Sequence, residues 1–98
     1  MKTYFVKTIS NINEMMLHSL MQSEFETTDL TEAKSVFEKE ISILNQTYLR
    51  ADKLTYQPTD KEYKHAVHCE IFSVEKDENE IIDDSLESVM MSDDYYPR

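Results

Sequence analysis

His65, His68 and Cys69 lie close together in the sequence and carry side chains that can do chemistry. Imidazole and thiolate are preferred ligands of Zn²⁺, and a cysteine with a histidine base is the arrangement of a thiol nucleophile. Residues 65–75, however, have the alternating pattern of a β-strand, on which neighbouring side chains point to opposite faces. His68 and Cys69 then point apart, and so do His65 and His68. We therefore expect no metal ion and no other cofactor.

Catalysis by the thiol is disfavoured by what surrounds Cys69 and by what the chain lacks. Acidic residues near a thiol disfavour the reactive thiolate. The chain contains no glycine, which the Walker loop, the dinucleotide-binding turn and the nucleophile elbow all need. We therefore predict that the protein is not an enzyme. A small enzyme or metal protein that uses His65, His68 and Cys69 is a competing hypothesis.

The clearest structural pattern covers residues 29–50 and predicts one long amphipathic helix. Asp29 is a suitable N-cap, and Glu32 stands three residues later, as in a capping box. Apolar residues recur at spacings of three and four, which places them on one face of a helix. This face contains Leu30, Ala33, Phe37, Ile41, Leu44 and Tyr48. Because an isolated amphipathic helix is only marginally stable in water, the apolar face needs a sheet to cover.

Three segments, residues 2–9, 65–75 and 81–90, have the composition and alternation of β-strands. The predicted order of elements is therefore β-α-β-β. The simplest packing is a two-layer α+β fold, in which the long helix lies across one face of a three-stranded, mainly antiparallel sheet. We predict one such domain over residues 1–92. Residues 93–98 then form a short acidic and aromatic C-terminal tail.

Two further segments have less regular patterns. Residues 12–21 are rich in methionine. They form either a short amphipathic helix at the edge of the core or a binding surface, because methionine side chains adapt to many shapes. Residues 54–64 include Pro58, followed by Thr59 and Asp60, and are predicted to connect the main helix to the second strand without regular structure.

The charge balance restricts the possible partners. The chain has a formal net charge of -10, and such an acidic protein repels nucleic acid and anionic lipid while attracting basic partners. No segment approaches the roughly 20 apolar residues of a membrane-spanning helix, and no apolar core of a secretory signal peptide follows the first residues. The single cysteine excludes an internal disulfide and suits a reducing compartment. We expect a cytoplasmic protein that binds neither nucleic acid nor membranes directly.

The acidic residues are concentrated in the last part of the chain. Residues 70–98 contain ten acidic and two basic residues and so carry -8 of the net charge of -10. Alternate residues of a strand are roughly 6.5–7 Å apart, about twice the spacing of successive phosphates along one DNA strand. Such a carboxylate array can occupy a basic patch or a nucleic-acid-binding groove of a partner protein. The alternative is a solvated hairpin that keeps the protein soluble and protects an edge strand.

The predicted partner-binding site combines these acidic residues with two aromatic anchors, because aromatic residues often dominate the energy of an interface. Its residues are Glu75, Asp77, Glu78, Glu80, Asp83, Asp84 and Glu87, together with Tyr95 and Tyr96.

The layout of the whole chain adds one expectation about function. It combines an opening strand, Met-Lys-Thr-Tyr-Phe-Val-Lys-Thr, with one long helix and an acid-rich hairpin over residues 75–87. In layout and charge the chain resembles small acidic proteins of phages and mobile elements, including inhibitors of host defence systems. The resemblance implies stoichiometric binding, of which DNA mimicry is one form. We therefore expect an inhibitor or modulator of another protein with a basic surface. The alternative is a self-associating homodimer without a charge-driven partner.

Overall fold

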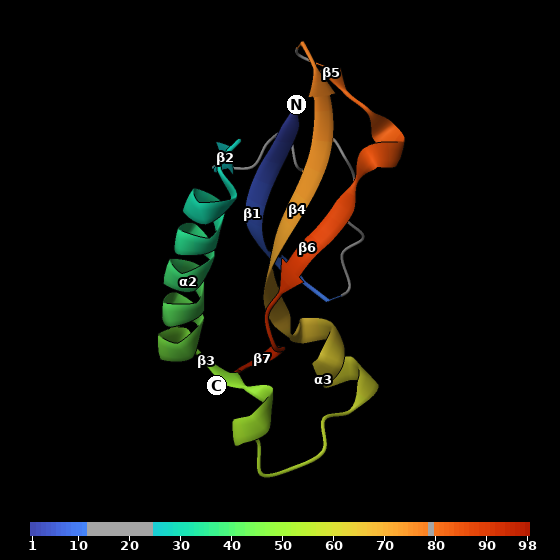
Figure 1. The fold of residues 1–98 in the computed structure, drawn as a ribbon. Helices are drawn as coiled ribbons and strands as arrows, with labels where there is room; N and C mark the ends of the chain where they lie inside the picture. Colours follow the sequence, from blue (N-terminus) through green and yellow to red (C-terminus); the bar gives the residue numbers. More distant parts are fainter. Residues whose placement is uncertain (12–24, 79) are drawn as a thin grey trace.

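The computed structural model describes residues 1–11, 25–78 and 80–98 as an α+β fold with one long helix and an antiparallel sheet (Figure 1). This confirms the predicted fold class. The methionine-rich segment predicted at residues 12–21 lies outside the described residues. The described part of the chain measures 48 × 25 × 18 Å and is therefore elongated. None of its helices combines the length and apolar character needed to cross a membrane.

Two long strands form the centre of the sheet. β1 (Lys2–Ser10) and β4 (Val67–Asp77) pair antiparallel along the whole length of β1, from Lys2 opposite Glu75 to Ser10 opposite Val67. Each strand has side chains buried on both faces of the sheet. The predicted strands at residues 2–9 and 65–75 correspond to β1 and β4, with a shift of two residues at each end of the second strand.

Short strands extend this central pair, and the expected number of three strands is wrong. Within the described residues the sheet has seven strands. β2 (Glu26–Thr27) pairs with β1, β5 (Glu80–Ile81) and β6 (Glu87–Met91) pair with β4, and β7 (Tyr95–Pro97) lies between β4 and β3 (Tyr48–Arg50). Strands of two or three residues are too short to produce a recognisable alternation in the sequence.

The predicted strand at residues 81–90 is interrupted. A 3₁₀ turn, η2 (Asp83–Ser85), separates β5 from β6. The Ser85 hydroxyl stabilises this turn through two hydrogen bonds. It accepts one from the Glu75 amide at 2.7 Å and donates one to the Ile82 carbonyl at 2.6 Å. A serine in an extended pattern can therefore end a strand by supplying a local partner for the backbone.

Helix α2 (Leu30–Thr47) covers one face of the sheet (Figure 1). Asp29 is its N-cap, as predicted, and its carboxylate accepts a hydrogen bond from the Thr31 amide at 2.9 Å. Ala33, Phe37 and Leu44 are buried against the sheet. Their cluster also contains Val6 of β1, Cys69 and Ile71 of β4, and Tyr95 of β7.

The other face of the sheet has a smaller core. Phe5, Phe72 and Val74 are buried there, and the partly buried Ile81 and Leu86 pack on them. The segment from β5 to β6 therefore folds over this face near the C-terminal end of β4, and it does not form a simple hairpin with β4.

Two segments differ from the sequence-based expectation of irregular structure. Residues 93–98 are not a tail, because Tyr95–Pro97 forms strand β7 inside the sheet. Part of the expected connection at residues 54–64 is helical. α3 (Asp60–His65) begins with a complete capping box between Thr59 and Glu62. His65 is thus the last residue of a helix and not the first residue of a strand.

Candidate functional site

The structure brings the predicted acidic residues to one end of the molecule. We call residues 75–87 the acidic tip; it contains the end of β4, the turn at Glu78, β5, η2 and the first residue of β6. Figure 1 shows this end at the top, away from β7 and α3 at the other end. Glu78 has a positive φ of 60° and so occupies the left-handed position of the turn. Non-glycine residues adopt this conformation only occasionally.

Most carboxylates of the acidic tip have no cationic partner among the described residues. Glu75 lies 3.3 Å from the amino group of Met1. Lys76, the one basic residue of the tip, pairs with Glu26 of β2 at 2.8 Å. No ion pair within the described part of the chain involves the other acidic side chains seen on the tip. These exposed residues are Asp77, Glu78, Glu80, Asp84 and Glu87. Within the described residues, most of the negative charge of the tip is therefore without an ion pair.

Tyr95 and Tyr96 do not belong to this surface. Tyr95 is 1% exposed and Tyr96 is 5% exposed. The Tyr95 hydroxyl donates a hydrogen bond to Asn45 Oδ1 of α2 at 3.0 Å. Both tyrosines lie in β7, at the end of the molecule opposite the acidic tip (Figure 1). Both tyrosines therefore lie apart from the acidic tip. Tyr95 belongs to the core cluster and is not an aromatic anchor on the surface, whereas Tyr96 lines a hollow at its own end of the molecule.

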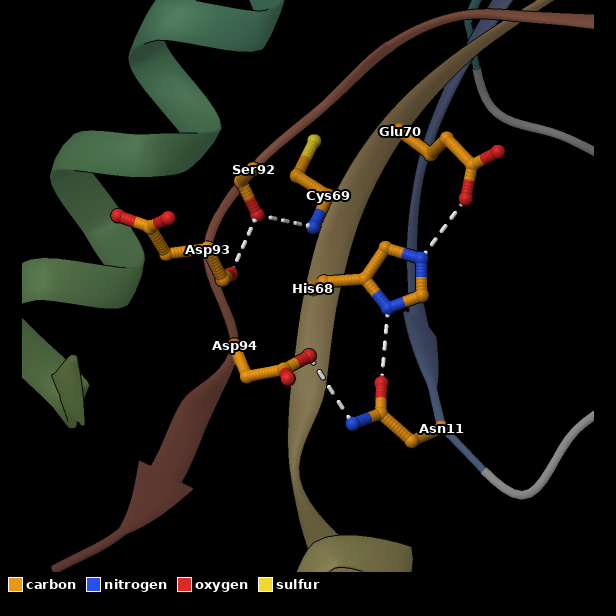
Figure 2. Close-up of polar contacts among 7 residues, drawn as sticks. All are labelled: Asn11, His68, Cys69, Glu70, Ser92, Asp93 and Asp94. Carbon is orange, nitrogen blue, oxygen red and sulfur yellow. Dashed lines mark hydrogen bonds and ion pairs between the residues drawn. The ribbon is translucent and has the colours of Figure 1, made fainter. Parts of the chain in front are cut away.

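A second polar site, which was not predicted, joins β1, β4 and the segment before β7 (Figure 2). His68 Nδ1 is 2.8 Å from Asn11 Oδ1, and His68 Nε2 is 2.8 Å from Glu70 Oε1. Asn11 Nδ2 donates to Asp94 Oδ1 at 3.0 Å. His68 and Glu70 are 9% and 5% exposed. We call these four residues the His68 chain.

The hydrogen bonds of the His68 chain determine how the side-chain amide of Asn11 is oriented. An ionised carboxylate can only accept, so the amide nitrogen of Asn11 faces Asp94 and its carbonyl oxygen faces His68. His68 Nδ1 must then carry a hydrogen. His68 Nε2 and Glu70 Oε1 are hydrogen-bonded at 2.8 Å in a buried environment, where such a bond is strong.

The engagement of both ring nitrogens determines what His68 can do. A hollow of about 470 Å³ lies next to the four residues of the His68 chain. It is lined by Ser10, Asn11, Ala51, Tyr63, His68, Met91, Ser92, Asp93 and Asp94. A histidine needs a free ring nitrogen to bind a metal ion or to accept a proton from a substrate. Neither nitrogen of His68 is free in this arrangement. The His68 chain therefore connects β-strands, and both ring nitrogens of His68 are engaged in it.

The structure does not bring His65, His68 and Cys69 together. His65 ends α3 and is exposed. Cys69 faces α2 and belongs to the core cluster there, whereas His68 and its neighbours Glu70 and Phe72 alternate onto the opposite face of β4. No group of three potential metal ligands gathers in residues 1–11, 25–78 and 80–98.

Cys69 is expected to react very slowly with thiol reagents in the native protein. It is 0% exposed, and burial raises the pKa of its thiol to about 11. The fraction of reactive thiolate falls about tenfold for each pH unit below the pKa. Near pH 8 only about one molecule in a thousand therefore carries the thiolate. Iodoacetamide labelling followed by mass spectrometry should show modification in denaturant and almost none without it. Equal labelling rates in both conditions would contradict the buried position of Cys69.

The His68 chain contains residues that sequence reasoning missed. Asn11 and Asp94 are 83 positions apart, and Asn11 and His68 are 57 positions apart, so no local pattern could indicate their contact. The sequence did contain a signal for the contact between His68 and Glu70. Two ionisable residues of complementary type at positions i and i+2 of one strand face the same side.

The fold and these sites define a small acidic α+β domain with a negatively charged end and a polar chain of four hydrogen-bonded residues. Comparisons with known protein families, with curated proteins and with solved structures found no match for this chain.

Proposed function

We propose that this protein is a non-catalytic, cytoplasmic binding module that acts as a stoichiometric inhibitor or modulator of another protein with a basic surface. The observation that supports the proposal is the acidic tip, where five exposed carboxylates have no ion pair within the described residues. An excess of one charge at one end of an elongated molecule steers it toward a partner of opposite charge.

The form of the tip also supports a role in binding. Its backbone is fixed by β4–β5 pairing and by the hydrogen bonds of Ser85. Carboxylates on a fixed backbone lose less conformational entropy on binding than carboxylates on a flexible tail. Display of negative charge in this way is compatible with DNA mimicry against a nucleic-acid-binding protein.

The edge of β6 favours a second candidate function, self-association. β6 pairs with β4 on one side, and no strand of the described residues pairs with its other side. Val89 is 40% exposed and Met91 is 58% exposed. An unpaired edge with apolar side chains is a template for pairing with another chain. Sedimentation equilibrium at several protein concentrations separates this alternative from a monomer that requires a different partner.

Reversal of charge at the tip is expected to weaken capture of the partner. We would immobilise the wild-type protein and the triple variant Glu80→Lys, Asp84→Lys, Glu87→Lys, and identify proteins retained from lysate of the source cell or its host. The bound partner should be basic, should dissociate at high salt because ionic interactions are screened, and should bind the variant at least about tenfold more weakly.

A matched control separates position from net charge. The variant Glu32→Lys, Glu38→Lys, Asp60→Lys makes the same change in net charge on exposed residues of α2 and α3. It should retain the partner that the tip variant loses. Retention of the same proteins by all three forms, at low and at high salt, would reject the proposed role of the tip.

A further inference from the structure

A second hollow, of about 200 Å³, lies at the end of the molecule opposite the acidic tip, between α3, β7 and the loop that precedes α3. It is lined by Tyr56, Glu62, His65, Tyr96 and Pro97. Three of these five residues have aromatic rings, and one is an acid. The lining therefore combines aromatic rings with a single carboxylate, and it contains no lysine or arginine.

Contacts within the fold hold two of the residues that line this hollow, Tyr96 and Glu62. Tyr96 is 5% exposed, and its backbone pairs with Leu49 of β3. No hydrogen bond of the Tyr96 hydroxyl is found among the described residues. Glu62 is held by the capping box of α3, in which its Oε1 accepts hydrogen bonds from the Thr59 amide at 3.2 Å and the Thr59 hydroxyl at 3.1 Å. Both residues thus keep their positions when the hollow is empty.

Glu62 gives the hollow a negative charge, and none of the other residues that line it is a lysine or an arginine. The hydrogen bonds from the Thr59 amide and hydroxyl lower the pKa of Glu62, so this carboxylate is ionised at neutral pH. Desolvation and then the neighbouring Glu62 carboxylate raise the pKa of Tyr56. Lys61 and Lys64 are on the same helix as Glu62, yet no ion pair of Glu62 is found within the described residues. Within the described residues Glu62 therefore has hydrogen-bond partners, Thr59 and Tyr56, but no cationic partner.

We propose that this hollow binds an organic cation, an alkylammonium or guanidinium group, against the aromatic rings of Tyr56 and Tyr96 with Glu62 as its counter-ion. The face of an aromatic ring attracts a cation electrostatically, and several rings together form the kind of cage that recognises quaternary ammonium groups. A nearby carboxylate strengthens this attraction and rejects anions. A neutral ligand of the same shape gains neither contribution.

The cation can belong to a small molecule or to a lysine or arginine side chain of a protein. Both sources present the same chemistry to the hollow, and the experiment below distinguishes them. The proposal does not depend on the acidic tip, because α3 and β7, which contribute to the hollow, lie at the opposite end of the molecule (Figure 1). Failure of one proposal therefore leaves the other intact.

The test is a titration of the full-length, isotopically labelled protein at constant ionic strength, followed by NMR spectroscopy. The probe is choline, and the control ligand is 3,3-dimethyl-1-butanol, which replaces its charged nitrogen with carbon. Choline should shift the resonances of Tyr56, His65 and Tyr96 in a saturable manner. The neutral analogue should bind at least about fivefold more weakly, since it lacks the cation–π and ionic attraction.

Two variants link the effect to the named residues. Glu62→Gln keeps the capping box, because glutamine serves at this position as well, but removes the charge; choline should bind it at least about threefold more weakly. Tyr56→Leu, at a residue that is 50% exposed, removes a ring without opening the core and should also weaken binding. The matched control Asp60→Asn removes one charge from the same helix outside the hollow and should leave choline affinity unchanged within about twofold.

The outcomes decide both the proposal and the source of the cation. Equal binding of choline and its neutral analogue, or equal affinity of the wild-type and Glu62→Gln proteins for choline, would overturn the proposal. Parallel titrations with Nα-acetyl-arginine amide and Nα-acetyl-lysine amide identify the source. Tighter binding of either amide than of choline assigns the hollow to a protein side chain, and the reverse order assigns it to a free quaternary ammonium compound. No saturable shift with any of the three cations would also overturn the proposal.

Discussion

Replacement of Glu70 by leucine is expected to lower the free energy of unfolding by about 3 kcal/mol. Removal of one partner from a buried ion pair typically costs about 3–5 kcal/mol, because the remaining charge has no compensation. We expect the low end of that range, because Asn11 still contacts the other ring nitrogen of His68 when Glu70 is absent. A domain of this size has a total stability of roughly 5–15 kcal/mol, so the loss is a large fraction of the total.

A double variant tests whether the two residues act as a pair. Replacing both partners of a buried ion pair by apolar residues often costs little or even stabilises the protein. His68→Leu, Glu70→Leu should therefore be more stable than Glu70→Leu alone. The double variant also removes the contact between His68 and the side-chain amide of Asn11. Asn11 is only partly buried and borders the hollow of about 470 Å³, so water can replace this contact.

Urea unfolding followed by circular dichroism provides the measurement. The denaturation midpoint should fall for Glu70→Leu with an unchanged dependence on urea concentration, because a change in midpoint alone reports stability. A loss below about 1 kcal/mol for the single variant would place Glu70 among ordinary exposed residues. That result would contradict both its burial and its contact with His68.

The elements that the sequence predicts correctly are those whose signal is local. Helix α2 has an apolar face that runs from Leu30 to Leu44 and a capping residue at Asp29. The predicted end of the helix is wrong, because Tyr48 continues the apolar spacing but lies in β3. Strands β1 and β4 are long enough to show alternation. The acidic tip is also continuous in the sequence, so its charge and its position at one end of β4 could be anticipated. In each case neighbouring residues carry the whole pattern.

The features that the sequence did not predict depend on contacts between distant segments. β3 and β7 are three residues each and are stabilised by pairing Leu49 with Tyr96. Either strand alone is too short for a period to be recognised. Tyr95 and Tyr96 stand between Asp93, Asp94 and a terminal Pro97-Arg98, a context that is typical of an exposed tail. Their burial follows from the place of β7 between β4 and β3, which only the three-dimensional structure shows.

Replacement of Tyr95 by alanine is expected to have the largest effect on stability among single substitutions in β7, about 3–5 kcal/mol, as for other large aromatic residues in cores. Its ring is 1% exposed and belongs to the cluster that contains Phe37 and Leu44. Tyr95→Phe keeps the ring and loses only the hydrogen bond to Asn45 Oδ1. This variant should lose about 1 kcal/mol.

The comparison between these two variants distinguishes a core strand from a tail. If residues 93–98 were a tail, Tyr95→Ala would change stability by no more than about 0.5 kcal/mol, as at ordinary surface positions. Tyr63→Ala supplies the matched control, because Tyr63 is 48% exposed and should show that small effect. Deletion of residues 93–98 removes Tyr95 and Tyr96 together and should shift the thermal unfolding midpoint further than Tyr95→Ala alone. A truncated protein with the wild-type midpoint would exclude β7 from the folded core, and with it the fixed position of Tyr96 on which the cation-binding hollow depends.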